Sequence, residues 1–440
     1  SIRENVLVIM TPLTNPDSHA RYVMWHGVYN VDGAALDPLA VENNAHWAMN
    51  TDGNAWGIDV NRDFGWFVSP EMGALGRAAM DWRPPLWLDI HSGPAVISFP
   101  PFSPPYHPLW QTTAMKWWEA VAQRAGDNFG KRGWSFSSRK DYEGHTETGV
   151  GRSWAMVGPS VSGFLYEAFG GRPGMTTAFV RRDGTVATMR MAMDHHKLGT
   201  YSLLQVASER REELVRDAHA RVVEGVAAAR ANRVKGVAIP SSGPDVDPDK
   251  VARLVDRLVL QDVQVRRLDE PVSVIASDFF DMARSETRTL PAGSYVVDFI
   301  QPQARLARAL LDPTVDLGNP SVEVPFDRKM PYYDVSWGSL ALLFGVPTYA
   351  LDRAVGDGGR LVEAAERLPG RVEGLDRPEP PYGYVLPAGR EASYRVAVRL
   401  MREGFRVRVF TDLARIRGED WPKGTFGIIR ARNPDGLDER

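Results

Sequence analysis

Leu86-Trp87-Leu88-Asp89-Ile90-His91-Ser92-Gly93 is the stretch that decides the fold class of this chain. It begins as a short apolar run and ends in polar residues, as does the later stretch Gly163-Phe164-Leu165-Tyr166-Glu167. Apolar runs of this length predict buried strands. Residues 109–129, which lie between the two stretches, carry apolar side chains at helical spacing. Strands alternating with helices predict an α/β layer structure.

Composition excludes several function classes. The 440 residues are 43% hydrophobic and 24% charged, with a net charge of −3, so neither nucleic acid nor an anionic membrane surface is an expected partner. No apolar run reaches the ~18 residues of a membrane span. The chain has no cysteine, so any metal site must use His, Asp and Glu. The sequence leaves the compartment and the oligomeric state open, with a secreted or periplasmic location as our expectation.

The chain divides into two predicted regions, because 440 residues are too many for one hydrophobic core. In the first, residues 1–235, the stretch 188–233 is helical almost without a break. It predicts a long surface helix that closes this region. The second, residues 236–440, is a further α/β region.

The second region contains an internal repeat. Each copy reads as strand, helix and strand, followed by a phrase of the form aromatic or apolar residue, Pro, small or basic residue, Gly. The matching stretches are 237–240, 263–265 and 290–295 in the first copy and 384–387, 405–407 and 421–426 in the second. Two βαβ-like repeats predict a parallel sheet.

Four phrases in the first region carry polar residues near predicted strands. They are Asn15-Pro16-Asp17, Gly57-Ile58-Asp59-Val60-Asn61-Arg62-Asp63-Phe64, Asp89-Ile90-His91-Ser92-Gly93 and Gly163-Phe164-Leu165-Tyr166-Glu167-Ala168-Phe169. Taken singly, each is weak, because Asn-Pro-Asp is ordinary turn chemistry and a lone His after a strand is more often structural than a ligand. Glu167 is the exception, since an ionised carboxylate in such apolar surroundings is costly to bury without a partner.

In this order the four phrases resemble the zinc metallocarboxypeptidases of the carboxypeptidase A-like family, over about residues 1–185. The resemblance implies a mixed central sheet flanked by helices, a bound Zn²⁺ and a peptide substrate with a free C-terminus. It implies that His91 is the third zinc ligand and Glu167 the general base, and that Asn61 and Arg62 grip the terminal carboxylate.

The residue types suit that chemistry. Zinc lowers the pKa of a bound water towards ~7. Glu167 would take the proton of that water and pass it to the leaving amine, while the fork of Arg62 matches a carboxylate. Two further candidates follow from the resemblance alone: Arg21, to polarise the scissile carbonyl, and Tyr142, to close over the substrate.

The family's first two zinc ligands come from a His-x-x-Glu phrase before the opening strand, and no His in this chain begins such a phrase. Residues 6–10 are an apolar run that predicts a buried strand almost at the start, so we expect the sequence to be cut upstream. One His is short of the three protein ligands of a catalytic zinc site. We therefore predict that the chain binds zinc poorly and has little peptidase activity.

The remaining histidines are not predicted ligands. His195 and His196 are adjacent on a predicted helix, so they face different directions and cannot form an i,i+4 pair. His19, His26 and His46 lie in predicted polar loops.

Other functions stay open. The second region resembles the class I glutamine amidotransferase-like domains of some bacterial members, although without a Cys it has no thiol nucleophile. The alternative to an enzyme is a non-catalytic peptide-binding pseudopeptidase that uses Asn61 and Arg62, and a third reading makes the first region a scaffold for the second. The sequence upstream of Ser1 would discriminate between enzyme and binding module.

Overall fold

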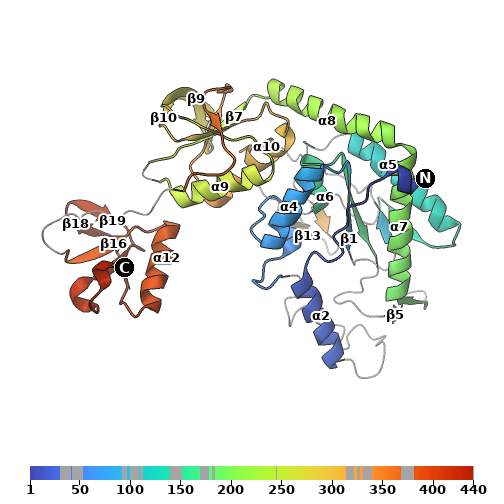
Figure 1. Ribbon diagram of the computed structural model, residues 1–440, viewed down its shortest axis with the longest axis horizontal. Coiled ribbons are helices and arrows are strands. Elements are labelled where there is room, and N and C mark those ends of the chain that lie inside the picture. The colour runs from blue at the N-terminus through green and yellow to red at the C-terminus, as the bar shows by residue number, and fades with distance from the viewer. Residues whose placement is uncertain are drawn as a thin grey trace.

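The computed structural model of the chain describes residues 1–29, 41, 53–91, 97–99, 109, 112–138, 151–168, 178–180, 184–243, 245–313, 322–324, 328–330, 339–367 and 381–439. Helices and mixed sheets alternate along these residues, so the predicted α/β class is confirmed (Figure 1). Within the described ranges, no helix is both long enough and apolar enough to cross a membrane.

A four-stranded sheet forms the centre of residues 1–235. Its strand order is β1-β4-β2-β3. β1 (Leu86–His91) and β4 (Ser162–Glu167) are parallel neighbours, whereas β2 (Ile97–Phe99) runs antiparallel to β4 and parallel to β3 (Phe136–Ser138). The two strands predicted from the apolar runs are therefore present and adjacent.

The two faces of this sheet are covered by different helices. Successive side chains of a strand point to opposite faces, so neighbouring residues of β1 contact different helices. On one face, Phe164 belongs to the core cluster that includes Trp117 of α5 (Thr112–Gly130), and Leu88 packs against that cluster. On the other, Trp87 packs into a cluster with residues of two further helices. These are α4 (Pro70–Trp82) and α6 (Gly151–Val157).

The helical stretch predicted over residues 188–233 is two helices. α7 (Met189–Glu209) and α8 (Arg211–Ala231) meet at Arg210, whose backbone leaves helical geometry at φ −112° and ψ 26°. Thr188 caps the first helix, since its side chain accepts the backbone N–H of Met191.

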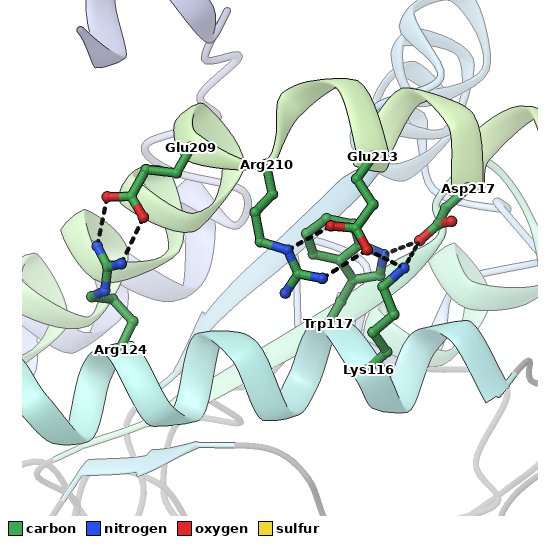
Figure 2. A network of polar contacts seen from close by, with 7 residues as sticks. All are labelled: Lys116, Trp117, Arg124, Glu209, Arg210, Glu213 and Asp217. Carbon is green, nitrogen blue, oxygen red and sulfur yellow. Dashed lines mark hydrogen bonds and ion pairs between the residues drawn. The ribbon is translucent and has the colours of Figure 1, made fainter.

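A polar network fixes this junction to α5 (Figure 2). Its residues are Lys116, Trp117, Arg124, Glu209, Arg210, Glu213 and Asp217. Arg210 binds Glu213 at 2.7 Å, and Lys116 lies 2.6 Å from Glu213 and 2.7 Å from Asp217. Hydrogen bonds from Arg210 and then Lys116 lower the pKa of Glu213 to about 2. The junction is thus held by charges from three helices.

The predicted strand at residues 6–10 is wrong. These residues form no strand and pair with no described strand, and Leu7 and Met10 are 72% and 73% exposed. Only the start of the run is held, since Val6 packs against the core and Asn5 donates to Ser208 at 3.0 Å. An apolar run becomes a buried strand only where other elements cover it, and no described element covers residues 7–10.

Asn15-Pro16-Asp17 is a helix start. The side chain of Asn15 accepts the backbone N–H of Ser18 at 3.1 Å, and α2 (Pro16–Tyr29) follows. Proline suits the first turn because its missing N–H would have no partner there. His19 and His26 therefore lie on α2 and not in loops, whereas His46 is outside the described residues.

Both copies of the repeat are present in residues 236–439. The first consists of β7 (Gly236–Ile239), α9 (Pro248–Leu260), β8 (Arg266–Arg267), the hairpin β9 (Val272–Asp278) and β10 (Asp281–Leu290), and β11 (Tyr295–Asp298). The second consists of β16 (Gly383–Leu386), α12 (Glu391–Arg402), β17 (Arg408–Val409), the hairpin β18 (Ala414–Ile416) and β19 (Glu419–Trp421), and β20 (Phe426–Ile429).

The predicted parallel sheet is wrong. β11 lies antiparallel between β7 and β8, and β20 lies antiparallel between β16 and β17. The first and third strands of each copy thus run in one direction, as a βαβ crossover requires, but the last strand is inserted between them. The βαβ pattern did not predict this, because it does not specify which strands are neighbours.

The copies match in detail. A side-chain amide bridges the same backbone positions in each: Gln301 receives the N–H of Gln264 and donates to Asp298, and Asn433 receives the N–H of Arg406 and donates to Ile429. The turn before the last strand closes with a bond of 3.2 Å in both, from Ser294 to Pro291 and from Thr425 to Pro422.

Further elements enlarge the first copy alone. They are α10 (Ala304–Leu311), α11 (Leu340–Phe344), β14 (Tyr349–Leu351) and β15 (Arg360–Leu361). β14 pairs with β7 and β15 with β8, giving a seven-stranded sheet. The second copy has its own small core and lies beside α9 (Figure 1).

The first copy shares one core with residues 1–235. A single hydrophobic cluster contains Phe67 and Trp154 together with Leu254 and Leu258 of α9. Gln261 bridges the two, since it accepts from Trp154 Nε1 and donates to the carbonyl of Gly65, each at 2.9 Å.

The remaining described elements are short. They are α1 (Ile2–Asn5), η2 (Val60–Arg62), β5 (Ala178–Val180), β6 (Val186–Thr188), β12 (Val322–Val324), β13 (Arg328–Met330), η3 (Arg430–Arg432) and η4 (Leu437–Glu439).

Candidate active site

The candidate site lies where β1 and β4 end. The parallel register pairs His91 with Glu167, the last residues of the two strands. Asp89 lies two residues before His91 and therefore on the same face of the sheet. Three of the residues quoted from the sequence thus come together at the carboxyl edge of a sheet, where open α/β sheets place their ligands.

His91 lies between two carboxylates. Its Nδ1 is 3.5 Å from Glu167 Oε1 and its Nε2 is 3.6 Å from Asp89 Oδ1. Burial by itself would lower the pKa of His91, but Asp89 and Glu167 outweigh it and raise the pKa to about 10. The two carboxylates thus favour the protonated form of the imidazole.

Glu167 is a buried carboxylate with one oxygen atom that accepts no hydrogen bond from the described residues. Its side chain is 8% exposed, and its Oε2 atom is buried with no hydrogen-bond partner among the described residues. A buried acceptor left without a partner is uncommon in a folded protein and marks a place where another group can bind. The flanking Phe164 and Tyr166 are fully buried.

α6 begins against Asp89. A side chain on Gly151, the first residue of α6, would collide with Asp89 Oδ2 and would also meet the Phe64 ring at 2.9 Å. Glycine at this position therefore lets the helix start close to the site.

Asn61 and Arg62 lie on η2, in a loop that reaches the same face of the sheet. Asp59 starts this turn by accepting the N–H of Asn61 at 2.9 Å. Phe64 then packs edge-on against Trp87, with ring centroids 6.1 Å apart. Trp87 shares its face of β1 with Asp89 and His91, so the loop is anchored beside the site. Whether the two side chains point at His91 and Glu167 stays a prediction.

Arg21 holds this loop from the other side. Its guanidinium on α2 donates to the backbone carbonyls of Gly53 and Asn54. Asp17, one turn earlier, accepts the N–H of Ala55 at 2.9 Å. The observed role of Arg21 is therefore to fix the loop, and carbonyl polarisation stays a prediction. Tyr142 lies outside the described residues.

His196 is a neighbour of the site that the sequence did not identify. It comes from α7, is hydrogen-bonded to the backbone of His91, and has a buried Nδ1 with no partner among the described residues. Burial is the main cause that lowers the pKa of His196 to about 4, so it is neutral at pH 7. His195 instead packs against Trp134, with ring centroids 4.7 Å apart and the ring planes tilted by 50°. Adjacent histidines on a helix gave no signal of which one would face the strand end.

The donor types near His91 suit zinc, but their number and placement do not complete a site. Among the described residues, no group of three or more His, Asp or Glu side chains is arranged to hold a metal ion. A catalytic zinc needs three protein ligands. We therefore derive no catalytic step through a metal from these residues.

Comparison with known proteins adds no relative. No protein family, no curated protein and no solved structure matches this chain.

Proposed function

We propose that this chain is a metallocarboxypeptidase-type peptide hydrolase, with Glu167 as general base and Asn61 and Arg62 as the clamp for a substrate's terminal carboxylate. The observation that carries the proposal is the pairing of His91 with Glu167 at the ends of two adjacent parallel strands. The roles of Asn61, Arg62 and Glu167 come from the resemblance of the four sequence phrases to the metallocarboxypeptidases.

Each residue has a separate task in this proposal. Glu167 accepts a proton from the attacking water and returns it to the leaving amine, which its buried position and spare acceptor atom favour. Arg62 offers two parallel N–H groups to a carboxylate, and Asn61 a further donor. Zinc, when bound, would activate the water, and His91 would be one of its ligands.

The alternative is a binding module without catalysis. The position of His91 favours it, because both ring nitrogens face carboxylates of this chain, Glu167 at 3.5 Å and Asp89 at 3.6 Å. Both functions use the carboxylate clamp, so the clamp and the chemistry need separate experiments.

The clamp is tested by binding. A peptide with a free C-terminus and its amidated twin are titrated into the 440-residue protein by calorimetry. We expect the free acid to bind more tightly, and Arg62→Ala to remove most of that difference, since a charge-assisted contact is worth about 1.5–3 kcal/mol. Equal binding of the two peptides by the wild type would exclude the clamp.

The chemistry is tested by hydrolysis with zinc added. If the protein cleaves the free-acid peptide, we expect Glu167→Gln to lower the rate by ~10²–10⁴-fold without loss of peptide binding. Glutamine keeps the size and one acceptor atom but cannot transfer a proton. Peptide binding without zinc-dependent cleavage assigns the chain to the binding module.

A further inference from the structure

The two copies of the repeat differ in how the outer edge of their third strand is covered. In the first copy β15 pairs antiparallel with β8, with Arg360 opposite Arg267 and Leu361 opposite Arg266. In the second copy β17 is the last strand of its sheet, and no described residue pairs with its outer edge. Its Val409 is 55% exposed.

The segment that follows β15 also covers the helix of the first copy. The N–H of Val362 donates to Val265 at 3.0 Å, and the N–H of Ala365 donates to Asp256 of α9 at 2.8 Å. Arg367 then forms an ion pair with Asp256. Residues 360–367 therefore act as one strap, which adds a strand to the sheet and crosses α9.

Equivalent positions follow from matching backbone bonds. The helix ends with a bond from Val263 to Leu258 in the first copy and from Phe405 to Leu400 in the second. Further along, Leu268 donates to Ser294 and Phe410 to Thr425, both at 2.8 Å. The copies align without insertion between these points, so Asp256, Arg266 and Arg267 correspond to Val398, Arg408 and Val409.

The helix position that the strap binds, Asp256, is replaced in the second copy by Val398, which lies in an exposed apolar stripe. Tyr394, Val398 and Met401 are 51%, 45% and 51% exposed and follow i, i+4, i+7 spacing, so they form one stripe on α12. Ala252, which corresponds to Tyr394, is 3% exposed. Tyr394 packs edge-on against Phe426, which pairs with Val409 of β17, so the stripe begins beside this strand.

We propose that the edge of β17 and the stripe Tyr394, Val398 and Met401 bind an extended segment of a partner protein, which adds to the sheet as an antiparallel strand and then crosses α12. The first copy shows how such a segment lies. Unpaired backbone groups on an edge strand supply the affinity, as in other cases of strand addition.

An arginine that both copies share indicates the chemistry at the start of the partner segment. Arg266 binds the carbonyl of Gly359 at 2.8 Å and Asp357 at 3.1 Å, just before the strap's strand. Arg408 takes its place, is exposed and has no partner in the described part of the chain. The partner segment therefore carries an acidic residue three positions before its strand.

The end of the partner segment is apolar. In the first copy, Glu366 pairs with Arg267 and Arg367 with Asp256. Val409 and Val398 replace those two partners, so charged residues at these positions of the segment would have no counter-charge and would leave the stripe uncovered. Apolar residues would instead complete the stripe.

Two synthetic peptides test the proposal against the full 440-residue protein. One has the sequence of residues 355–367; the other carries Glu366→Leu and Arg367→Leu. We expect the apolar peptide to bind saturably, measured by fluorescence anisotropy, and the parent peptide at least about tenfold more weakly, since the two leucines cover apolar surface of the stripe and the charged side chains do not. Binding should slow amide exchange along β17.

Two variants make the result specific. Val398→Asp restores the residue of the first copy, so it should weaken the apolar peptide about tenfold and strengthen the parent peptide. Arg408→Glu should weaken the apolar peptide more than it weakens a version that also carries Asp357→Asn, which keeps only the contact with the Gly359 carbonyl. Val398 is exposed, so its replacement leaves the core of the unit intact, which unchanged exchange of β20 amides would verify.

Four results would overturn the proposal. They are no saturable binding of either peptide, binding that both variants leave unchanged, amides along β17 already protected without peptide, and a dimer that Val398→Asp converts to a monomer. The third would mean that the chain covers this groove itself, and the fourth that a second copy of the chain occupies it.

Discussion

The first and second copies of the repeat have the same backbone plan and different surroundings. The helix position occupied by Leu254 is fully buried in the first copy, while Val396 at the equivalent position is 42% exposed. Gln261 is fully buried between Trp154 and Gly65, whereas its counterpart Glu403 is exposed. The local sequence therefore builds the module, and the neighbours decide which of its apolar positions become core.

The difference also shows what each copy does in the molecule. The first joins residues 1–235 through a shared hydrophobic cluster and through Asp262, which pairs with Arg77 and Arg83 at 3.2 and 3.0 Å. Gly404 stands at the equivalent position in the second copy, and both residues have a positive φ, 57° and 90°. The shared turn needs the left-handed conformation, but only the first copy adds a charge that binds α4 and the residue after it.

The largest effect should come from truncating the buried helix position. Leu254→Ala removes side-chain volume from a closed core and should lower the free energy of unfolding by about 2–5 kcal/mol. Val396→Ala, its matched control, should cost less than about 1 kcal/mol. Denaturant unfolding followed by tryptophan fluorescence measures both. Equal losses of stability would mean that Val396 is covered in solution, which would contradict the difference in burial between the two copies.

A smaller effect is expected at Gln261. Gln261→Ala leaves the buried Trp154 N–H and Gly65 carbonyl without their partner, at a cost of about 1–3 kcal/mol. Glu403→Ala changes an exposed residue and should stay within about 0.5 kcal/mol. The same denaturant series compares them. A loss at Glu403 as large as that at Gln261 would show that the second copy also docks through this position.

The amide bridge should give similar effects in both copies. Gln301→Ala and Asn433→Ala each remove a side chain that bonds three backbone groups, and each should cost about 1–2 kcal/mol. The buried Gln301 should be the more sensitive, since Asn433 is half-buried and water can replace its bonds. Amide exchange of Gln264 and Arg406 reports the loss locally. If one variant has no effect, the bridges are not equivalent.

The smallest effect should be a pH dependence confined to the first copy. Burial raises the pKa of Asp298, although hydrogen bonds from Val355 and Gly356 oppose the shift. The folded state then holds this proton more tightly than the unfolded state does, so stability from this group falls as pH rises above about 4. Ile429, at the equivalent position, does not titrate.

Asp298→Asn should therefore lose stability relative to the wild type as the pH is lowered from 6 to 4. Unfolding curves at each pH, with Asn433→Ala as a non-titrating control, measure the difference. A wild type that loses stability relative to Asp298→Asn over this range would reverse the sign and contradict the assignment.

Sequence reasoning succeeded where local pattern and burial agreed. The apolar runs ending at His91 and Glu167 predicted two strands, and the register placed both residues at one sheet edge. It failed at residues 6–10, where hydrophobicity alone predicted burial, and it missed His196, because a helix pattern does not say which strand end the helix will meet.

The sequence by itself determined the α/β class, the strands that carry His91 and Glu167, and the duplicated strand-helix-strand unit. Each of these depends on spacing between residues close in the chain. Tertiary structure alone decided that the last strand of each copy is inserted antiparallel, and that Leu254 is core while Val396 is surface. Such outcomes depend on which distant segments pack together, and short-range periodicity carries no information about that.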